Sequence, residues 1–214
     1  MGTTVADVMT TRVIAVRRNA DFKQIAHVLR DSRVSACPVI NDLGQVVGIV
    51  SEADLLYKTA DAELPAGLIR LRWKLGQESK ITAITAAQLM TSPAVVIEPD
   101  APVQFAARVM RDRRVKRLPV VNAGGELIGV VSRADVLGVY DRPDADILAE
   151  VTRVIEEEFG LSMAYFQATV SSGVVTLSGL VAQQETALEL AARIRHIEGV
   201  VAVRDRLTCG TPID

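Results

Sequence analysis

Two serine–aspartate pairs with the same spacing are the residues of this chain best suited to ligand chemistry: Ser51 with Asp54, and Ser132 with Asp135. Each serine ends an apolar, strand-forming run and precedes a helical pattern. At such a junction a hydroxyl and nearby backbone N–H groups can hold an anion such as phosphate. The aspartate can accept two hydrogen bonds from a vicinal diol, as in a ribose. The simpler alternative is a Ser-x-x-Asp helix cap without a ligand.

A pair of cations, Lys116 and Arg117, stands just before the Leu118-Pro119 of a predicted strand. Ammonium and guanidinium groups are suited to phosphate. The alternative is a solvated basic helix end, because four more arginines precede the pair: Arg108, Arg111, Arg113 and Arg114. RNA binding is disfavoured, since no aromatic residues that could stack on bases are interleaved with these cations.

An internal repeat organises the first two thirds of the chain. Matching residues, such as Met9 and Met90, are 81 positions apart throughout. Three separated motifs recur without a gap: Val8-Met9-Thr10 as Leu89-Met90-Thr91, Cys37-Pro38-Val39-Ile40 as Leu118-Pro119-Val120-Val121, and 48–54 as 129–135. The chain therefore contains a duplicated structural unit.

Each unit is predicted to contain a short strand, a helix, two strands and a closing helix. The first has a strand over 13–16, a helix capped by Asn19, strands around a turn at 41–44, and a helix opening at Asp54. The second has Asp100 as helix cap and its turn at 122–125. Apolar runs without strict alternation indicate a sheet covered on both faces. A lone unit could not bury that surface, so the two units are predicted to pack together.

Residues 61–86 are expected to connect the units, and 68–75 have the pattern of a short basic amphipathic helix. Two interpretations stay open for this helix. It is either a solvated connector whose apolar stripe docks on the repeats, or a contact surface for a partner or a membrane.

The paired units resemble a tandem pair of CBS domains, known as a Bateman module, over about Val5–Tyr57 and Ala87–Tyr140. The opening Val-Met-Thr signature, the proline before the second strand and the Gly-h-h-Ser-x-x-Asp motif (h is apolar) carry the resemblance. It implies a mixed α/β (α+β) fold. Paired β-α-β-β-α repeats, at 1–60 and 87–140, would be related by a pseudo-twofold axis, with two ligand sites in the cleft between them.

The resemblance also implies roles for individual residues. In CBS domains that bind adenosine compounds, the equivalent aspartate holds the ribose and the serine or threonine lies on the phosphate side. Each site joins the aspartate of one repeat to the pre-proline segment of the other. The first site would contain Ser51, Asp54, Val115, Lys116 and Arg117. The second would contain Ser132, Asp135, Val34, Ser35 and Ala36.

The two predicted sites differ in charge. The first carries two cations suited to phosphate. The second is neutral in its pre-proline segment and would suit adenosine, a monophosphate held by hydroxyls, or a sulfonium ligand. Ile14 and Val95 are candidates to line an apolar adenine slot, with a place in the plain core as the alternative.

The last third of the chain is predicted to form a separate αββαβ domain. After a break at 141–144 that contains an aspartate able to cap a helix, a helix through Ile147–Phe159 precedes strands at 165–170 and 174–179 around a Ser172-Gly173 turn. A helix over 187–194 and a strand over 200–207 follow. The order, with Gly173–Gly179 and Glu198–Val203, resembles a BON domain over residues 144–210.

BON domains are often linked to membranes or phospholipids. Here the arginines of the domain are offset by acidic residues, which disfavours lipid contact. We therefore interpret this part as an oligomerisation or partner-docking domain, with lipid contact as the alternative.

Composition excludes several classes of function. A net charge of −2 argues against bulk attraction to nucleic acid or anionic lipid. The absence of a signal-peptide pattern and of an apolar run of transmembrane length predicts a cytoplasmic location. Cys37 and Cys209 lack the spacing of a disulfide framework or a zinc site. His27 and His196 fall in different domains, and no nucleophile elbow, Walker loop or dinucleotide fingerprint accompanies them, so no enzyme is predicted.

These observations predict a cytoplasmic, non-enzymatic sensor. AMP, ADP or ATP would bind between the repeats and bias their packing, and a partner-docking BON-like domain would report the change to an unknown protein target. No cofactor is required; S-adenosylmethionine and NAD are further candidate ligands, and a homodimer is expected. The alternative is a structural adaptor with vestigial nucleotide sites, whose BON-like domain docks a membrane or a protein. A third interpretation, nucleic-acid binding through 108–117, would show a steep loss of affinity with salt.

Overall fold

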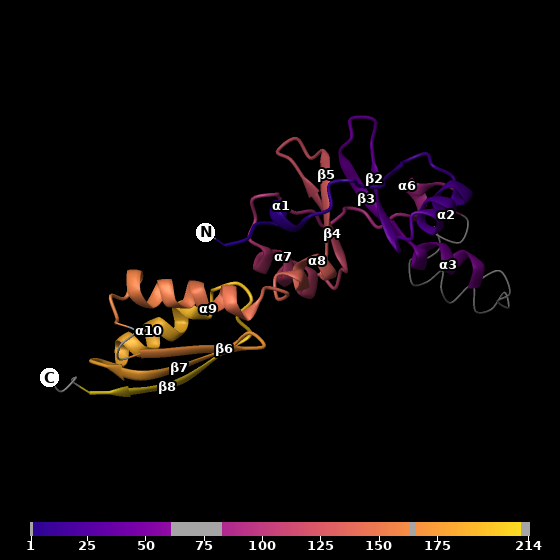
Figure 1. The fold of residues 1–214 in the computed structure, drawn as a ribbon. Coiled ribbons are helices and arrows are strands. Elements are labelled where there is room, and N and C mark those ends of the chain that lie inside the picture. Colours follow the sequence, from indigo (N-terminus) through magenta and orange to yellow (C-terminus); the bar gives the residue numbers. More distant parts are fainter. Residues whose placement is uncertain (1, 61–82, 163–165, 211–214) are drawn as a thin grey trace. The chain divides into compact units, whose positions relative to one another are not determined.

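A computed structural model describes residues 2–60, 83–162 and 166–210 (Figure 1). The chain divides into two compact units, one of residues 4–133 and one of residues 134–214 together with residues 1–3. The amphipathic helix predicted at 68–75 lies outside the described residues. No helix of the described residues is long and apolar enough to cross a bilayer.

The two repeats have the same order of elements. The first contains α1 (Val5–Val8), β1 (Val16–Arg17), α2 (Phe22–Asp31), β2 (Ala36–Ile40), β3 (Val46–Ser51) and α3 (Glu52–Ala60). The second contains α6 (Ala86–Leu89), α7 (Val103–Asp112), β4 (Arg117–Val121), β5 (Leu127–Ser132) and α8 (Arg133–Gly138). The short helices α1 and α6 were not predicted. The strand predicted at 13–16 is confined to Val16–Arg17, and in the second repeat its place is taken by a bridge between Ile97 and Val120.

Strand pairing repeats at the same offset of 81 residues. In the first repeat β2 and β3 are antiparallel, with Cys37 opposite Val50. In the second, β4 and β5 are antiparallel, with Leu118 opposite Val131. Asn41 closes the first turn, because its side-chain oxygen accepts the N–H groups of Leu43 at 3.0 Å and Gln45 at 2.9 Å. Asn122 does the same in the second turn. The predicted turns are thus confirmed.

Both predicted helix caps of the repeats are wrong. Helix α2 is capped by Asp21 and not by Asn19, because Asp21 forms a reciprocal capping box with Gln24 three residues on. Helix α7 begins after Pro102 and not after Asp100. The residue before a proline is disfavoured in helical conformation, so Ala101 cannot begin the helix.

Within residues 4–133, the segment that opens each repeat pairs with the other repeat and not with its own. Thr10 and Val130 donate their N–H groups to each other's carbonyl oxygens at 3.0 Å. Thr91 forms the equivalent bridge with Ile49 at 2.8 and 3.0 Å. A side chain at Gly48 would collide with Met90 of the exchanged segment. Glycine at this position therefore permits the close approach of the two repeats, and their predicted packing against each other is confirmed.

The C-terminal domain is a three-stranded sheet with helices on one face. It contains α9 (Asp144–Arg153), a π-helical extension η2 (Val154–Glu158), β6 (Phe166–Ser171), β7 (Val174–Val181), α10 (Gln184–Ile194) and β8 (Ala202–Cys209). The strand order is β6-β7-β8, with β6 and β7 antiparallel and β8 parallel to β7. The predicted αββαβ order is confirmed, with the last strand two residues further along the chain.

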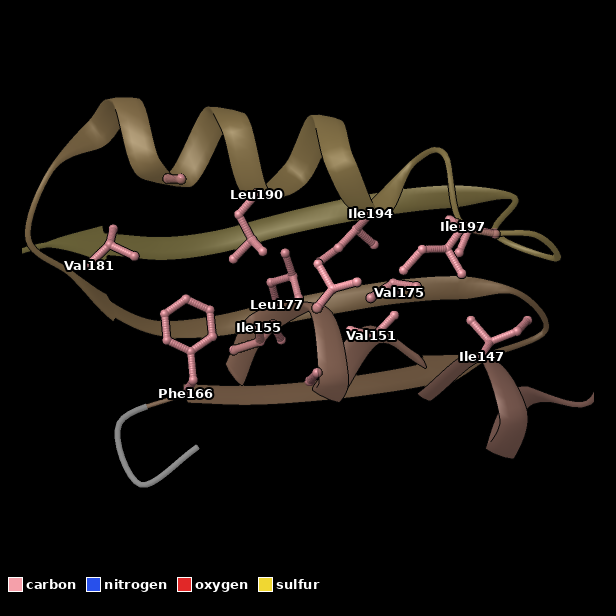
Figure 2. Packing of buried hydrophobic residues seen from close by; sticks show 14 residues of the cluster. Ile147, Val151, Ile155, Phe166, Val175, Leu177, Val181, Leu190, Ile194 and Ile197 are labelled. Atoms are coloured by element: carbon pink, nitrogen blue, oxygen red, sulfur yellow. The ribbon is translucent and has the colours of Figure 1, made fainter. Parts of the chain in front are cut away.

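One apolar core holds this domain together (Figure 2). Ile147 and Val151 of α9, Leu190 and Ile194 of α10, and Leu177 of β7 are all fully buried in it. Only alternate residues of the strands belong to the core, so both helices cover the same face of the sheet.

The aspartate cap predicted within 141–144 does not form at the start of α9. The N-cap of this helix is Pro143, and the Asp144 carboxylate accepts the N–H groups of Ser172 at 2.7 Å and Gly173 at 2.8 Å. These two residues form the β6–β7 turn with positive φ angles of 51° and 71°. The N–H groups of these two turn residues need an acceptor outside the hairpin, and the Asp144 carboxylate provides it.

Candidate functional site

A cavity of about 460 Å³ lies within the CBS-like unit and is lined by both repeats. Its volume is in the range of small-molecule sites. The first repeat contributes the start of β2, the end of β3 and the first turns of α3, and the second contributes the segment after Met90 and the start of β4. The lining residues are Ser35, Ala36, Ile49, Ser51, Glu52, Ala53, Asp54, Leu56, Thr91, Pro93, Ala94, Val95, Val115, Lys116 and Arg117.

Asp54 is the buried carboxylate of this cavity. Only 7% of the residue is exposed, and it stands in the first turn of α3, directly after β3 ends at Ser51. Its Oδ2 accepts the Ser51 backbone N–H at 2.9 Å and the Ser51 hydroxyl at 2.7 Å. The Ser-x-x-Asp cap predicted as the simpler alternative therefore forms. The cap also fixes the carboxylate at the cavity wall, so capping and ligand binding do not exclude each other.

Arg117 brings positive charge to the same cavity from the second repeat. Its Nη1 donates to the Ala36 carbonyl oxygen and its Nη2 to the Ser35 hydroxyl, both at 2.8 Å. Burial raises the pKa of the nearby Cys37 thiol to about 11, and the positive charge of Arg117 opposes that rise. Lys116 is exposed, and its carbonyl oxygen accepts the Arg133 N–H at 3.1 Å.

All five residues predicted for the first site line this one cavity, namely Ser51, Asp54, Val115, Lys116 and Arg117. Val95, a candidate for the adenine slot, lines it as well. Ser35 and Ala36, which were predicted for the second site, line it as well. Val34 packs against the buried core of the first repeat instead. Ile14 is 40% exposed and is not among the lining residues.

Sequence reasoning missed part of the lining. Glu52 and Ala53 lie between the predicted serine and aspartate, so the motif itself pointed to them. Thr91 and Pro93 follow the opening signature of the second repeat, and the exchange of that segment between repeats brings them to the cavity. Leu56, 63% exposed, lies one helical turn after Glu52 and had no sequence signal of its own.

The second site stays a prediction. Ser132 ends β5 and Asp135 stands in the first turn of α8, as their counterparts do in the first repeat. Asp135 belongs to one compact unit, and Ser35 and Ala36 to the other. The charge predicted for this site also left out Arg133, which takes the place of Glu52 and donates to the Val115 carbonyl oxygen at 3.1 Å.

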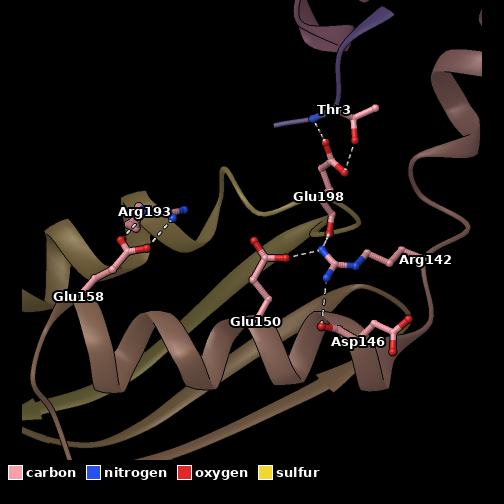
Figure 3. Close-up of polar contacts among 7 residues, drawn as sticks. All are labelled: Thr3, Arg142, Asp146, Glu150, Glu158, Arg193 and Glu198. Atoms are coloured by element: carbon pink, nitrogen blue, oxygen red, sulfur yellow. Dashed lines mark hydrogen bonds and ion pairs between the residues drawn. The ribbon is translucent and has the colours of Figure 1, made fainter. Parts of the chain in front are cut away.

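The C-terminal domain contains a smaller polar cluster (Figure 3). Arg142 contacts Glu150 at 2.5 Å and also donates to the Glu198 carbonyl oxygen. Arg193 makes two hydrogen bonds of 2.7 Å to Glu158. Each of these guanidinium groups is paired with a carboxylate of its own domain, so the cluster leaves little free positive charge.

The described residues contain no group of three or more histidine, cysteine or acidic side chains that could hold a metal ion. His27 contacts Arg30 at 2.8 Å, and the ring Nδ1 of His196 contacts the Ala192 carbonyl oxygen at 2.8 Å. Both histidines thus have local helical partners, and neither lines the cavity.

Comparison with known proteins agrees with this architecture. A family model of the CBS domain matches residues 5–61 and 86–142, and one of the BON domain matches 143–211. The uncharacterized protein MJ1426 of Methanocaldococcus jannaschii is 31% identical over 62% of this chain and 88% of its own length. The chloroplastic CBS domain-containing protein CBSX2 of Arabidopsis thaliana is 31% identical over 64% of this chain.

Structures and longer relatives extend the comparison. The crystal structure of CBSX2 in complex with AMP has a TM-score of 0.57 and 29% identity, over 64% of this chain and 95% of that one. A homoserine O-acetyltransferase of Methanococcoides burtonii is 30% identical over 63% of this chain. The chain spans 63% of the full CBSX2 sequence and 23% of the acetyltransferase, so such a pair of repeats also occurs inside larger proteins. Since both family models match in order along the sequence, the chain belongs to the CBS-domain family and consists of two CBS repeats followed by a BON domain.

Proposed function

We propose that the CBS pair is a regulatory module that binds an adenosine ligand in the cavity beside Asp54. The observation that carries the proposal is the meeting of a buried carboxylate from one repeat with two cations from the other in one cavity of about 460 Å³. The AMP complex of CBSX2, which is 29% identical, supports the ligand class.

The contacts indicate which residue of the site would hold which part of the ligand. A serine hydroxyl has a single proton to donate, and Ser51 gives its proton to Asp54. Ser51 therefore orients the carboxylate, and Asp54 accepts the ribose hydroxyls. The phosphate is held by Lys116 and Arg117, since charge-assisted hydrogen bonds of cations to phosphate are the strong ones. Val95 belongs to the apolar part of the lining, where the adenine would lie.

Regulation requires that a ligand change the rest of the molecule. Asp135 of the predicted second site stands in the first turn of α8, and the chain runs from α8 through 139–143 into α9 of the BON domain. Arg142, in this connection, is tied to Glu150 of α9. We propose that ligand binding in the CBS pair is relayed through this connection to a BON domain that docks a target, without catalysis and within a homodimer.

Calorimetric titration of the full chain with AMP, ATP and S-adenosylmethionine tests this function. Asp54→Asn keeps an oxygen for the Ser51 cap and removes the charge. Because a hydrogen bond to a charged group contributes about 1.5–3 kcal/mol, we expect a loss of affinity of roughly 10-fold to 150-fold.

Asp7→Asn is the matched control. Asp7 accepts the Thr4 backbone N–H at 2.8 Å and the Thr4 hydroxyl at 2.7 Å, which is the arrangement of Ser51 and Asp54 repeated away from the cavity. Its replacement should leave the affinity unchanged. Failure of the wild-type chain to bind any of the three ligands would instead support the adaptor, in which the sites are vestigial.

A further inference from the structure

Arg117 is held in place by the first repeat, although it belongs to the second. The guanidinium group offers five N–H donors in a fixed planar fork. One donor of Nη1 goes to the Ala36 carbonyl oxygen and one of Nη2 to the Ser35 hydroxyl, both at 2.8 Å. These two acceptors take two of the five donors. The side of the fork that carries Nε therefore keeps N–H groups for a second acceptor.

The residues that hold Arg117 also line the cavity beside Asp54. Ser35 is exposed and Arg117 is half-buried, so the contact lies at the cavity rim and not in the core. The only part of this contact that depends on a side chain of the first repeat is the Ser35 hydroxyl, because the other acceptor is a backbone carbonyl. A hydroxyl at this position thus contributes to the orientation of a cation that lines the cavity.

We propose that Ser35 is a positioning residue which, through Arg117, makes this cavity selective for adenosine ligands that carry a phosphate. The inference rests on the proposed function and names its ligand class. A long arginine side chain loses rotamer freedom when it binds, and a guanidinium that is already held by Ser35 loses less of it. This smaller loss of entropy improves the affinity only for ligands whose phosphate contacts Arg117. Adenosine, which has no phosphate, gains nothing from it.

Four variants of the full chain test this role, each titrated calorimetrically with AMP and with adenosine. Ser35→Ala removes the hydroxyl, and Ser35→Thr keeps it. Arg117→Ala removes the guanidinium, and the double variant Ser35→Ala/Arg117→Ala shows whether the serine acts through the arginine. Circular dichroism of each variant checks that the fold is retained.

We expect Ser35→Ala to weaken AMP binding about five-fold, the equivalent of one net hydrogen bond, and to leave adenosine binding unchanged. Ser35→Thr should restore the AMP affinity. Arg117→Ala should abolish the preference for AMP over adenosine, and Ser35→Ala should have no further effect in that background.

Two results would overturn the inference while the proposed function stands. One is an equal effect of Ser35→Ala on AMP and adenosine, including no effect on either. The other is a loss of AMP affinity that persists in the Arg117→Ala background, which would mean that Ser35 touches the ligand directly. Failure of the wild-type chain to bind AMP would overturn the inference. Failure to bind AMP, ATP and S-adenosylmethionine alike would overturn the proposed function as well.

Discussion

Replacing Gly48 by alanine probes the packing that joins the two CBS repeats. An added Cβ would collide with the Met90 side chain and come within 3.0 Å of the Thr91 carbonyl oxygen. The methionine can rotate away. The carbonyl cannot, because it accepts the Ile49 N–H at 3.0 Å in the bridge between the repeats. Overpacking of this kind costs about 1–3 kcal/mol, and we expect Gly48→Ala to lose that much free energy of unfolding.

Gly129→Ala is the matched control, since Gly129 has the equivalent position in the second repeat. The three atoms nearest to its added Cβ all belong to the Met9 side chain. A methionine is flexible enough to move aside, and alanine also lowers the conformational entropy of the unfolded chain. We therefore expect a cost below about 1 kcal/mol for this variant.

Hydrogen exchange of the β3 and β5 amides, measured against urea concentration, gives the two costs. The amides of β6 and β7 serve as an internal reference, because the C-terminal domain forms a separate compact unit. Equal destabilisation by the two substitutions, or a larger one by Gly129→Ala, would refute the argument that the Thr91 carbonyl sets the difference.

Two further predictions concern glycine and cysteine positions. Gly173 and Gly160 both have positive φ angles, but only at Gly173 would an added Cβ come within 2.6 Å of a backbone carbonyl oxygen. Alanine should therefore cost about 1 kcal/mol at Gly160 and clearly more at Gly173 in thermal unfolding. At pH 8, maleimide should label the exposed Cys209 and spare the buried Cys37. Because burial raises the pKa of the Cys37 thiol from 9.0 to about 11, the free energy of unfolding should fall as the pH rises from 9 to 11, where the unfolded chain ionises this thiol and the folded chain does not.

The internal repeat predicted correctly those features that depend only on neighbouring residues and recur at equivalent positions of both units. The turns at Asn41 and Asn122 follow from an asparagine whose side chain satisfies N–H groups two and four residues ahead. The helix caps were predicted wrongly where several polar residues competed. At the start of α2 the choice between Asn19 and Asp21 depends on Gln24, whose side chain completes a capping box only with Asp21.

The meeting of Asp54 with Arg117 in one cavity was predicted from the family resemblance combined with the constant offset of the repeats. The assignment of Ser35 to the second site alone did not anticipate its place beside Asp54. The constant offset shows which backbone positions are equivalent in the two repeats, but it does not predict the conformation of a long side chain. The guanidinium of Arg117 contacts the segment of the first repeat that is its own counterpart in sequence, so Ser35 and Ala36 line the same cavity as Asp54.

The duplicated unit is unequal at this contact. Arg117 and Ala36 are counterparts at the offset of 81 residues, and the guanidinium of the one lies on the carbonyl oxygen of the other. An arginine at both positions would bring two like charges into the same few ångströms, which is unfavourable even near a protein surface. Two guanidinium groups at these positions would therefore repel each other. Arg117 is the one arginine among the described lining residues of the Asp54 cavity, and the alanine at position 36 avoids this repulsion.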